Sequence, residues 1–163
     1  MIDYNQHNPE PKEYLHGNVI YDFVEFSNIP FETLKQSILN FKEINQKDFH
    51  DSDSTFDFYE NSKTYIYDLL GANWNTVGPA NKMNKFIPGI MELIQNHPGN
   101  SFMEFGGGLG VFTEIIKKHT NKDVTYVDVK GYISDFAEWR FKKHNFKLFL
   151  NVKHKFPIQP TVF

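Results

Sequence analysis

The chain has no cysteine among its 163 residues. This absence excludes disulfide scaffolds, thiolate metal sites and cysteine nucleophiles. Seven histidines are present, but none has the H-x3-H or H-E-x-x-H spacing that is typical of zinc ligands. The sequence therefore predicts no metal site.

Arginine is nearly absent, because Arg140 is the single arginine beside 16 lysines. The bidentate contacts that arginine makes to phosphate groups are therefore almost unavailable to this chain. The net charge is -3, although residues 101–163 hold 10 basic residues against 6 acidic ones. A nucleic-acid-binding domain is usually strongly basic, so we expect no nucleic-acid partner.

Long apolar runs are also missing, since no stretch approaches the roughly 18 apolar residues of a membrane span. The first residues, MIDYNQHNPEPKEY, have neither the basic nor the apolar region of a signal peptide. Together with the absent cysteines, these features predict a cytoplasmic protein with no membrane partner. Aromatic residues are plentiful, with 17 phenylalanines, which indicates a folded chain.

The first hundred residues predict an irregular arm followed by helices. Residues 1–18 have little apolar pattern, and Pro30 is expected to open a helix over 30–41. A turn at 50–55, rich in capping residues, precedes a predicted helix over 56–71, in which Gly71 would be the glycine after the last turn. A third helix is expected over 81–97, kinked or split at Pro88.

From residue 101 onward, the pattern alternates between strands and helices. Strands are predicted over 101–105, 124–129 and 146–152, and helices over 111–119 and 133–144. This order predicts an α/β fold with a parallel sheet. We therefore divide the chain into an N-terminal arm and helical cap, 1–99, and an α/β part, 100–163. His119 and His144 are expected at helix ends, and Lys142 and Lys143 in solvent.

A glycine loop, GGGLG, directly follows the first predicted strand. Because glycine has no Cβ atom, a ligand can touch the backbone of such a loop. The helix that follows would point its positive end at that ligand. Asp128 lies near the end of the second predicted strand, 22 residues after Gly106. An acid at this position can bind both hydroxyls of an adenosine ribose, so the segment predicts a site for an adenosine-containing cofactor.

Two cofactor classes compete for this loop. The dinucleotide fingerprint G-x-G-x-x-G/A fails in both registers, because Val111 or Thr113 occupies the last small position. The pattern acid-x-G-x-G-x-G fits at every position, with Glu104 as the acid followed by Gly106, Gly108 and Gly110.

The segments MEFGGGLG and TYVDV resemble the first two signature motifs of class I S-adenosylmethionine-dependent methyltransferases, and DFAEWRFKKHN resembles the second helix of a bacterial subset of them. The resemblance covers about residues 55–152. It implies a Rossmann-like sheet with the strands in the order 3-2-1. It also implies an enzyme that transfers a methyl group from S-adenosyl-L-methionine to a small-molecule or other acceptor, which the sequence does not identify.

The resemblance also implies roles for individual residues. Gly106, Gly108 and Gly110 would let the backbone approach the methionine and ribose parts of the cofactor, and Glu104 would contact or orient the methionine amino group. Asp128 would bind the ribose hydroxyls. The full set predicted to bind the cofactor is Tyr59, Glu104, Phe105, Gly106, Gly107, Gly108, Gly110, Asp128 and Val129.

Two members of this set carry more specific expectations. Val129 could flank the adenine ring. Tyr59 is expected to face the methionine end of the cofactor from the preceding helices, with core packing as its alternative role. No catalytic residue is assigned, because methyl transfer mainly requires alignment, and a base is needed only when the acceptor must lose a proton.

Proteins of this family usually continue through four more strands, whereas this chain ends soon after its third. We therefore expect a truncated product, a fragment or half of a split enzyme, with little or no methyl transfer by the chain alone. The first strand would be an exposed apolar edge, open to self-association or to a partner chain. The alternatives are a non-catalytic interaction module and a nucleotide-dependent oxidoreductase, which Val111 and Thr113 disfavour.

Overall fold

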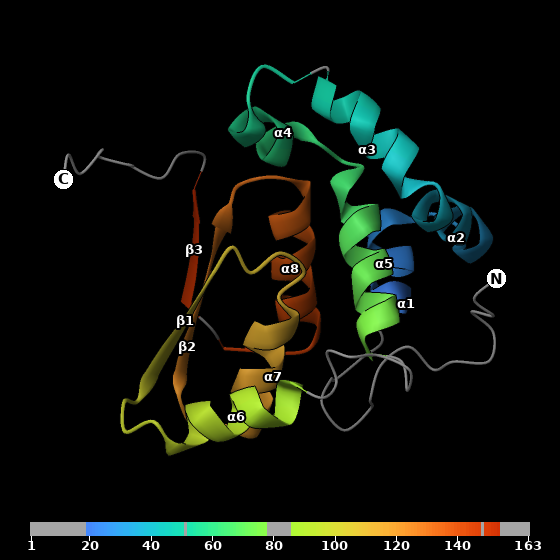
Figure 1. Ribbon diagram of the computed structural model, residues 1–163. Coiled ribbons are helices and arrows are strands. Elements are labelled where there is room, and N and C mark those ends of the chain that lie inside the picture. Colours follow the sequence, from blue (N-terminus) through green and yellow to red (C-terminus); the bar gives the residue numbers. More distant parts are fainter. Residues whose placement is uncertain (1–18, 51, 78–85, 148, 154–163) are drawn as a thin grey trace.

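The computed structural model describes residues 19–50, 52–77, 86–147 and 149–153. Helices come first along the chain, and strands alternating with helices follow (Figure 1). The described elements are α1 (Val19–Ser27), α2 (Phe31–Leu39), α3 (Phe41–His50), α4 (Thr55–Asn61), α5 (Tyr65–Val77), α6 (Phe86–Asn96), β1 (Ser101–Phe105), α7 (Val111–His119), β2 (Asp123–Val129), α8 (Tyr132–Lys143) and β3 (Phe149–Lys153). Within these ranges, no helix combines the length and the apolar character needed to cross a bilayer.

The described strands form one parallel sheet with β2 between β1 and β3, which confirms the predicted α/β class with a parallel sheet. Phe105 pairs with Val127, and Asp128 pairs with Val152. The connections run through α7 and α8, which lie on the same side of the sheet in Figure 1. The third strand begins at Phe149, three residues later than predicted. Because the strands are parallel, the carboxyl ends of β1 and β2 meet at one edge, where the glycine loop lies.

β1 is an edge strand of the sheet that the described residues form. Its side chains alternate between faces, as in any strand. Phe102 and Glu104 are half-buried on the side of α7, whereas Met103 and Phe105 are 61% and 71% exposed on the other side. The predicted exposed apolar edge is therefore present within the described part of the chain.

The core is shared between the N-terminal helices and the α/β part. Phe23 of α1 packs edge-on against Phe136 of α8, with ring centroids 5.2 Å apart. Buried residues from both sides of the predicted boundary at 99/100 belong to one cluster, among them Ile20, Leu34, Ile66, Ile115 and Val124. The helical part thus packs directly on the α/β part, and the boundary itself stays a prediction.

The prediction of one helix over 56–71 is wrong in two respects, because the segment forms two helices and the second of them extends beyond residue 71. The structure divides the segment into α4 and α5 because the Ser62 hydroxyl accepts the backbone N–H groups of Thr64 and Tyr65 and interrupts the first helix. The predicted N-terminal cap is confirmed, since the Ser54 hydroxyl accepts the N–H of Asp57 at 3.0 Å. A serine with local backbone partners can therefore break an apolar pattern that looks continuous.

Gly71 does not end a helix, because α5 continues through it to Val77. A Cβ atom at Gly71 would lie 3.0 Å from Cγ2 of Ile38 in α2. This glycine therefore serves the close packing of α5 on α2 and is not a helix terminator.

Two further helix predictions need correction. The helix predicted over 30–41 ends at Leu39, and a separate helix, α3, follows it. Pro88 falls in the first turn of α6 as described, where no helical N–H is lost, and the helix continues through it to Asn96, so it is not split there. Residues 81–85 of the predicted third helix lie outside the described residues.

The end of α8 also differs in part from expectation. His119 is the last residue of α7 and His144 follows α8, as predicted. Lys142 is exposed, but Lys143 does not simply face solvent, because its ammonium group donates to Asp22 at 2.8 Å and to Glu25 at 2.6 Å. The correction reflects α1, a helix that was not predicted and that brings these two acids to α8.

Candidate functional site

The glycine loop lies between the end of β1 and the start of α7. The N–H groups of Gly106 and Gly107 both donate to the carbonyl oxygen of Val127, at 2.8 and 3.2 Å, which ties the loop to β2. Gly106, Gly108 and Gly110 have positive φ angles of 69°, 53° and 72°. Other residues rarely adopt this conformation, so these three positions explain why the loop is built from glycine.

Two glycines of the loop are also required by the rings beneath it. A Cβ atom at Gly107 would lie 2.5 Å from Cε2 of Tyr126, and one at Gly110 would lie 2.3 Å from Cζ of Phe141. The two rings pack edge-on, with centroids 5.3 Å apart. Gly107 and Gly110 therefore let the backbone rest on an aromatic platform, which is a packing role.

Gly106 has a different environment. The space that its Cβ would enter is open, with no described atom within 4 Å of that position. At Gly108, a Cβ would make an ordinary contact of 3.5 Å with Cδ1 of Leu69, so α5 reaches over this part of the loop. Among the loop glycines, Gly106 is thus the one whose side leaves room for a ligand to touch the backbone.

Asp128 is hydrogen-bonded to the loop and to its own strand. Its Oδ2 accepts the N–H of Gly108 at 2.6 Å, and its Oδ1 accepts the N–H of Val129 at 2.6 Å. The carboxylate is half-buried, and a carboxylate offers about four acceptor positions. Asp128 can therefore hold the loop and still accept hydroxyl groups from a ligand, so the predicted ribose site fits the residues present.

Tyr126 supports both the loop and Asp128. Its hydroxyl lies 2.8 Å from the carbonyl oxygen of Gly108 and 3.1 Å from Oδ2 of Asp128, and its one proton can go to either. Burial raises the pKa of Tyr126, and the charge of Asp128 raises it further, so the phenol stays protonated. Tyr126 thus acts as a neutral donor beneath the loop.

Glu104 caps α7 from the neighbouring strand. Its Oε2 accepts the N–H of Thr113 at 2.8 Å and also the hydroxyl of Thr113. Burial raises the pKa of Glu104, whereas the two bonds from Thr113 lower it and the nearby charge of Asp128 raises it. Both bonds from Thr113 go to Oε2, so they leave the other carboxylate oxygen, Oε1, available.

Tyr59 lies beside the end of β2. The C-terminal turn of α4 approaches Gly131, where a Cβ would lie 3.1 Å from the carbonyl oxygen of Tyr59. The Tyr59 ring is 40% exposed and packs edge-on against Tyr65, with centroids 5.1 Å apart. The pKa of Tyr65 is raised to about 12 by burial first, then by Tyr59 and other neighbours including Asp128. The predicted contact of Tyr59 with the methionine end of a cofactor stays a prediction.

The remaining predicted residues lie at different places. Val129 is half-buried at the end of β2, next to Asp128. Phe105 is directed to the open face of the sheet, away from the side on which Glu104 contacts α7. The structure therefore brings Glu104, the glycine loop, Asp128 and Val129 together at one edge, with Phe105 on the other face.

Several residues of this edge were not predicted. Tyr126 stands two residues before Asp128 and so shares its face of the strand, a period-two signal that the sequence contained. Leu69 and Arg140 reach the loop from distant segments, through the close approach of Leu69 to Gly108 and the bond from Arg140 to Leu109. Thr113 belongs to α7 and binds Glu104 across the loop.

A polar hollow lies at the amino ends of β1 and β2, at the opposite end of these strands from the glycine loop. The ammonium group of Lys122 there donates to the carbonyl oxygens of His97, at 2.8 Å, and of Gly99. Two of the donor positions of this ammonium group are thus used by the main chain. Over the described ranges, no cluster of three or more acidic or histidine side chains could hold a metal ion.

Comparisons with models of protein families, with curated proteins and with solved structures found no match for the chain. The functional conclusion therefore depends on the residues and geometry of the glycine-loop edge.

Proposed function

We propose that the chain contains the S-adenosyl-L-methionine-binding part of a class I methyltransferase-like domain with a Rossmann-like sheet, covered by N-terminal helices. One observation carries the proposal. The open side of Gly106, the N-terminus of α7 and the carboxylate of Asp128 meet at the carboxyl edge of β1 and β2. Open backbone, a helix N-terminus and a ribose-binding acid are the features that bind nucleoside cofactors. The glycine spacing and the β1-β2-β3 order support the methyltransferase class.

In this proposal, different residues of the edge bind different parts of the cofactor. Asp128 accepts the ribose hydroxyls while it keeps the N–H of Gly108. Glu104 offers Oε1 to the amino group of the methionine part while Oε2 stays on Thr113. Val129 flanks the adenine, and Tyr59 borders the site from α4.

When bound, S-adenosyl-L-methionine supplies a methyl group on a positively charged sulfur, which an acceptor nucleophile attacks in line. The contribution of this chain is alignment of the ligand, since proximity and orientation lower the barrier of such a transfer. We assign no general base among the described residues. The acceptor is a small molecule or another nucleophile that the edge does not specify.

Calorimetry with S-adenosylhomocysteine, S-adenosylmethionine and NAD tests the proposal. We expect both S-adenosyl compounds to bind the unmodified chain and NAD not to bind. Asp128→Asn should weaken binding by about tenfold or more, which is about 1.4 kcal/mol, because it removes the charge that attracts the hydroxyls. Asp123→Asn is the matched control, since Asp123 begins the same strand and is exposed at its far end.

The outcomes separate the candidate functions. Binding of NAD in place of the S-adenosyl compounds would favour the oxidoreductase alternative. Binding of none of the three would contradict the proposal and favour a non-catalytic interaction module, for which the exposed β1 edge is the supporting observation.

A further inference from the structure

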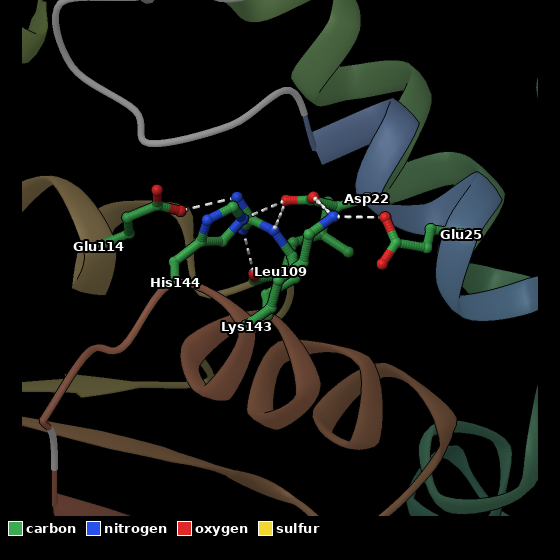
Figure 2. Close-up of polar contacts among 7 residues, drawn as sticks. Asp22, Glu25, Leu109, Glu114, Lys143 and His144 are labelled. Carbon is green, nitrogen blue, oxygen red and sulfur yellow. Dashed lines mark hydrogen bonds and ion pairs between the residues drawn. The ribbon is translucent and has the colours of Figure 1, made fainter.

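Arg140, the single arginine of the chain, is completely buried on α8. Its guanidinium group donates to groups from three segments. Nε donates to Oδ2 of Asp22 in α1 at 3.0 Å, Nη1 to the carbonyl oxygen of Leu109 at 3.2 Å, and Nη2 to Oε2 of Glu114 in α7 at 2.6 Å. Figure 2 shows these partners converging between α1, the loop and α8.

The cluster is electrically balanced although it lies in the core. Burying a guanidinium group is costly unless charges and hydrogen bonds compensate it. Two buried carboxylates, Asp22 and Glu114, provide that compensation. Asp22 is held in turn by Lys143 and by the ring of His144 (Figure 2). Burial alone would raise the pKa of Asp22, but the bonds from Lys143, His144 and Arg140 lower it overall, which keeps the carboxylate charged.

The position of Leu109 gives this cluster a consequence for the loop. Leu109 lies between Gly108 and Gly110, both of which have positive φ angles. Its carbonyl group belongs to the peptide that leads into Gly110, and Arg140 holds that group while Phe141, the next residue, packs under Gly110. The same guanidinium group binds Glu114, in the first turns of α7. Arg140 thus connects to both sides of the loop-to-helix junction.

We propose that Arg140 is a positioning residue, which holds the glycine loop in its ligand-ready conformation before any ligand binds, and that Asp22 makes this depend on α1. The identity of the ligand rests on the proposed function above. The N-terminal helix is then part of the binding machinery, because it supplies the carboxylate that orients the guanidinium group. Glycine loops lose more conformational freedom on ordering than other segments, so fixing the loop in advance favours ligand binding.

Hydrogen exchange of the loop amides, measured without ligand, tests this inference. The N–H groups of Gly106, Gly107, Gly108 and Gly110 all donate within the described structure, so each has protection to lose. Arg140→Lys keeps the charge but cannot reproduce the planar fork. We expect these amides to exchange about tenfold faster or more in the variant. Amides of α2, far from the loop, should change only as much as the variant's overall stability changes.

Two further variants complete the experiment. Asp22→Asn keeps Arg140 and an acceptor oxygen but removes the charge, so it should speed loop exchange in the same direction, and it decides the question if Arg140→Lys is too unstable to purify. Glu25→Gln is the matched control. Within the described residues, the exposed carboxylate of Glu25 pairs with Lys143 and not with Arg140. It should leave loop exchange unchanged.

The two proposals fail in different ways. If loop amides exchange at the unmodified rate in the folded variants, or speed up only together with those of α2, Arg140 has a merely structural role and the inference is overturned. This holds whether or not S-adenosylhomocysteine binds. If the unmodified chain binds no S-adenosyl compound, the proposed function fails, and a local increase in exchange still establishes Arg140 as the residue that positions the loop.

Discussion

Gly110 and Gly106 have nearly the same positive φ angle but different surroundings. A left-handed conformation costs an alanine about 1–2 kcal/mol, and overpacking against Phe141 adds about 1–3 kcal/mol at Gly110 alone. We therefore predict that Gly110→Ala lowers the free energy of unfolding by about 2–5 kcal/mol and Gly106→Ala by about 1–2 kcal/mol. Urea unfolding of the two variants measures the difference, and equal losses would contradict the packing role of Gly110.

Glu104 gives the stability a dependence on pH. Its pKa is raised in the folded chain, mainly by burial, so the folded state binds the proton more tightly than the unfolded state. Stability should therefore fall as pH rises from the unfolded pKa, near 4.3, through the folded pKa, and then level off. Glu104→Gln, whose amide oxygen can accept both bonds from Thr113, should remove this fall. Unfolding curves between pH 4 and 8 test it, and parallel pH profiles for the variant and the unmodified chain would contradict it.

At the scale of residues, the sequence sufficed for groups whose role is local. Glu104, the loop glycines and Asp128 were predicted because strand ends and glycine spacing place them at one edge. Arg140 could not be assigned, because its partner Asp22 is 118 residues away along the chain. No local sequence pattern contains such a pair. The single arginine among 16 lysines was the one sign in the sequence that this residue has a special role.

The helices show the same limit at the scale of elements. The two helices that connect the strands, α7 and α8, were predicted within a residue of their bounds. The break between α4 and α5 was missed because it depends on the hydroxyl of Ser62, whose partners include Asp48, 14 residues earlier. The role of Gly71 was missed because it depends on Ile38 in another helix.

Two helical glycines allow a direct test of this point. Gly89 lies exposed in α6, and a Cβ added there would have no described atom within 4 Å, whereas a Cβ at Gly71 would meet Ile38 at 3.0 Å. Gly89→Ala should raise the free energy of unfolding by about 0.5–1 kcal/mol, because alanine favours a helix over glycine by that amount. Gly71→Ala should show less gain or a net loss, since its extra atom crowds α2. Thermal unfolding of both variants distinguishes them, and equal gains would contradict the packing role of Gly71.

At the scale of the whole molecule, one side of the sheet is packed and the other is open at β1. The N-terminal helices, α7 and α8 share one core, and Arg140 joins α1 to the glycine loop within it. In the described part of the chain, the N-terminal helices and the α/β part therefore pack together on the side of the sheet that faces α7. On the opposite side, Met103 and Phe105 remain exposed along an edge strand.

An exposed apolar edge strand favours association, because its backbone groups and side chains can pair with another chain. We predict that the mass measured by light scattering rises with protein concentration, and that Met103→Lys prevents this rise. A lysine at a position that is 61% exposed should change stability by less than about 0.5 kcal/mol. Leu93→Lys is the control, since Leu93 is 74% exposed but lies on α6. If both lysine variants reduce association equally, or the unmodified chain stays monomeric throughout, the β1 edge is not the surface through which the chain pairs.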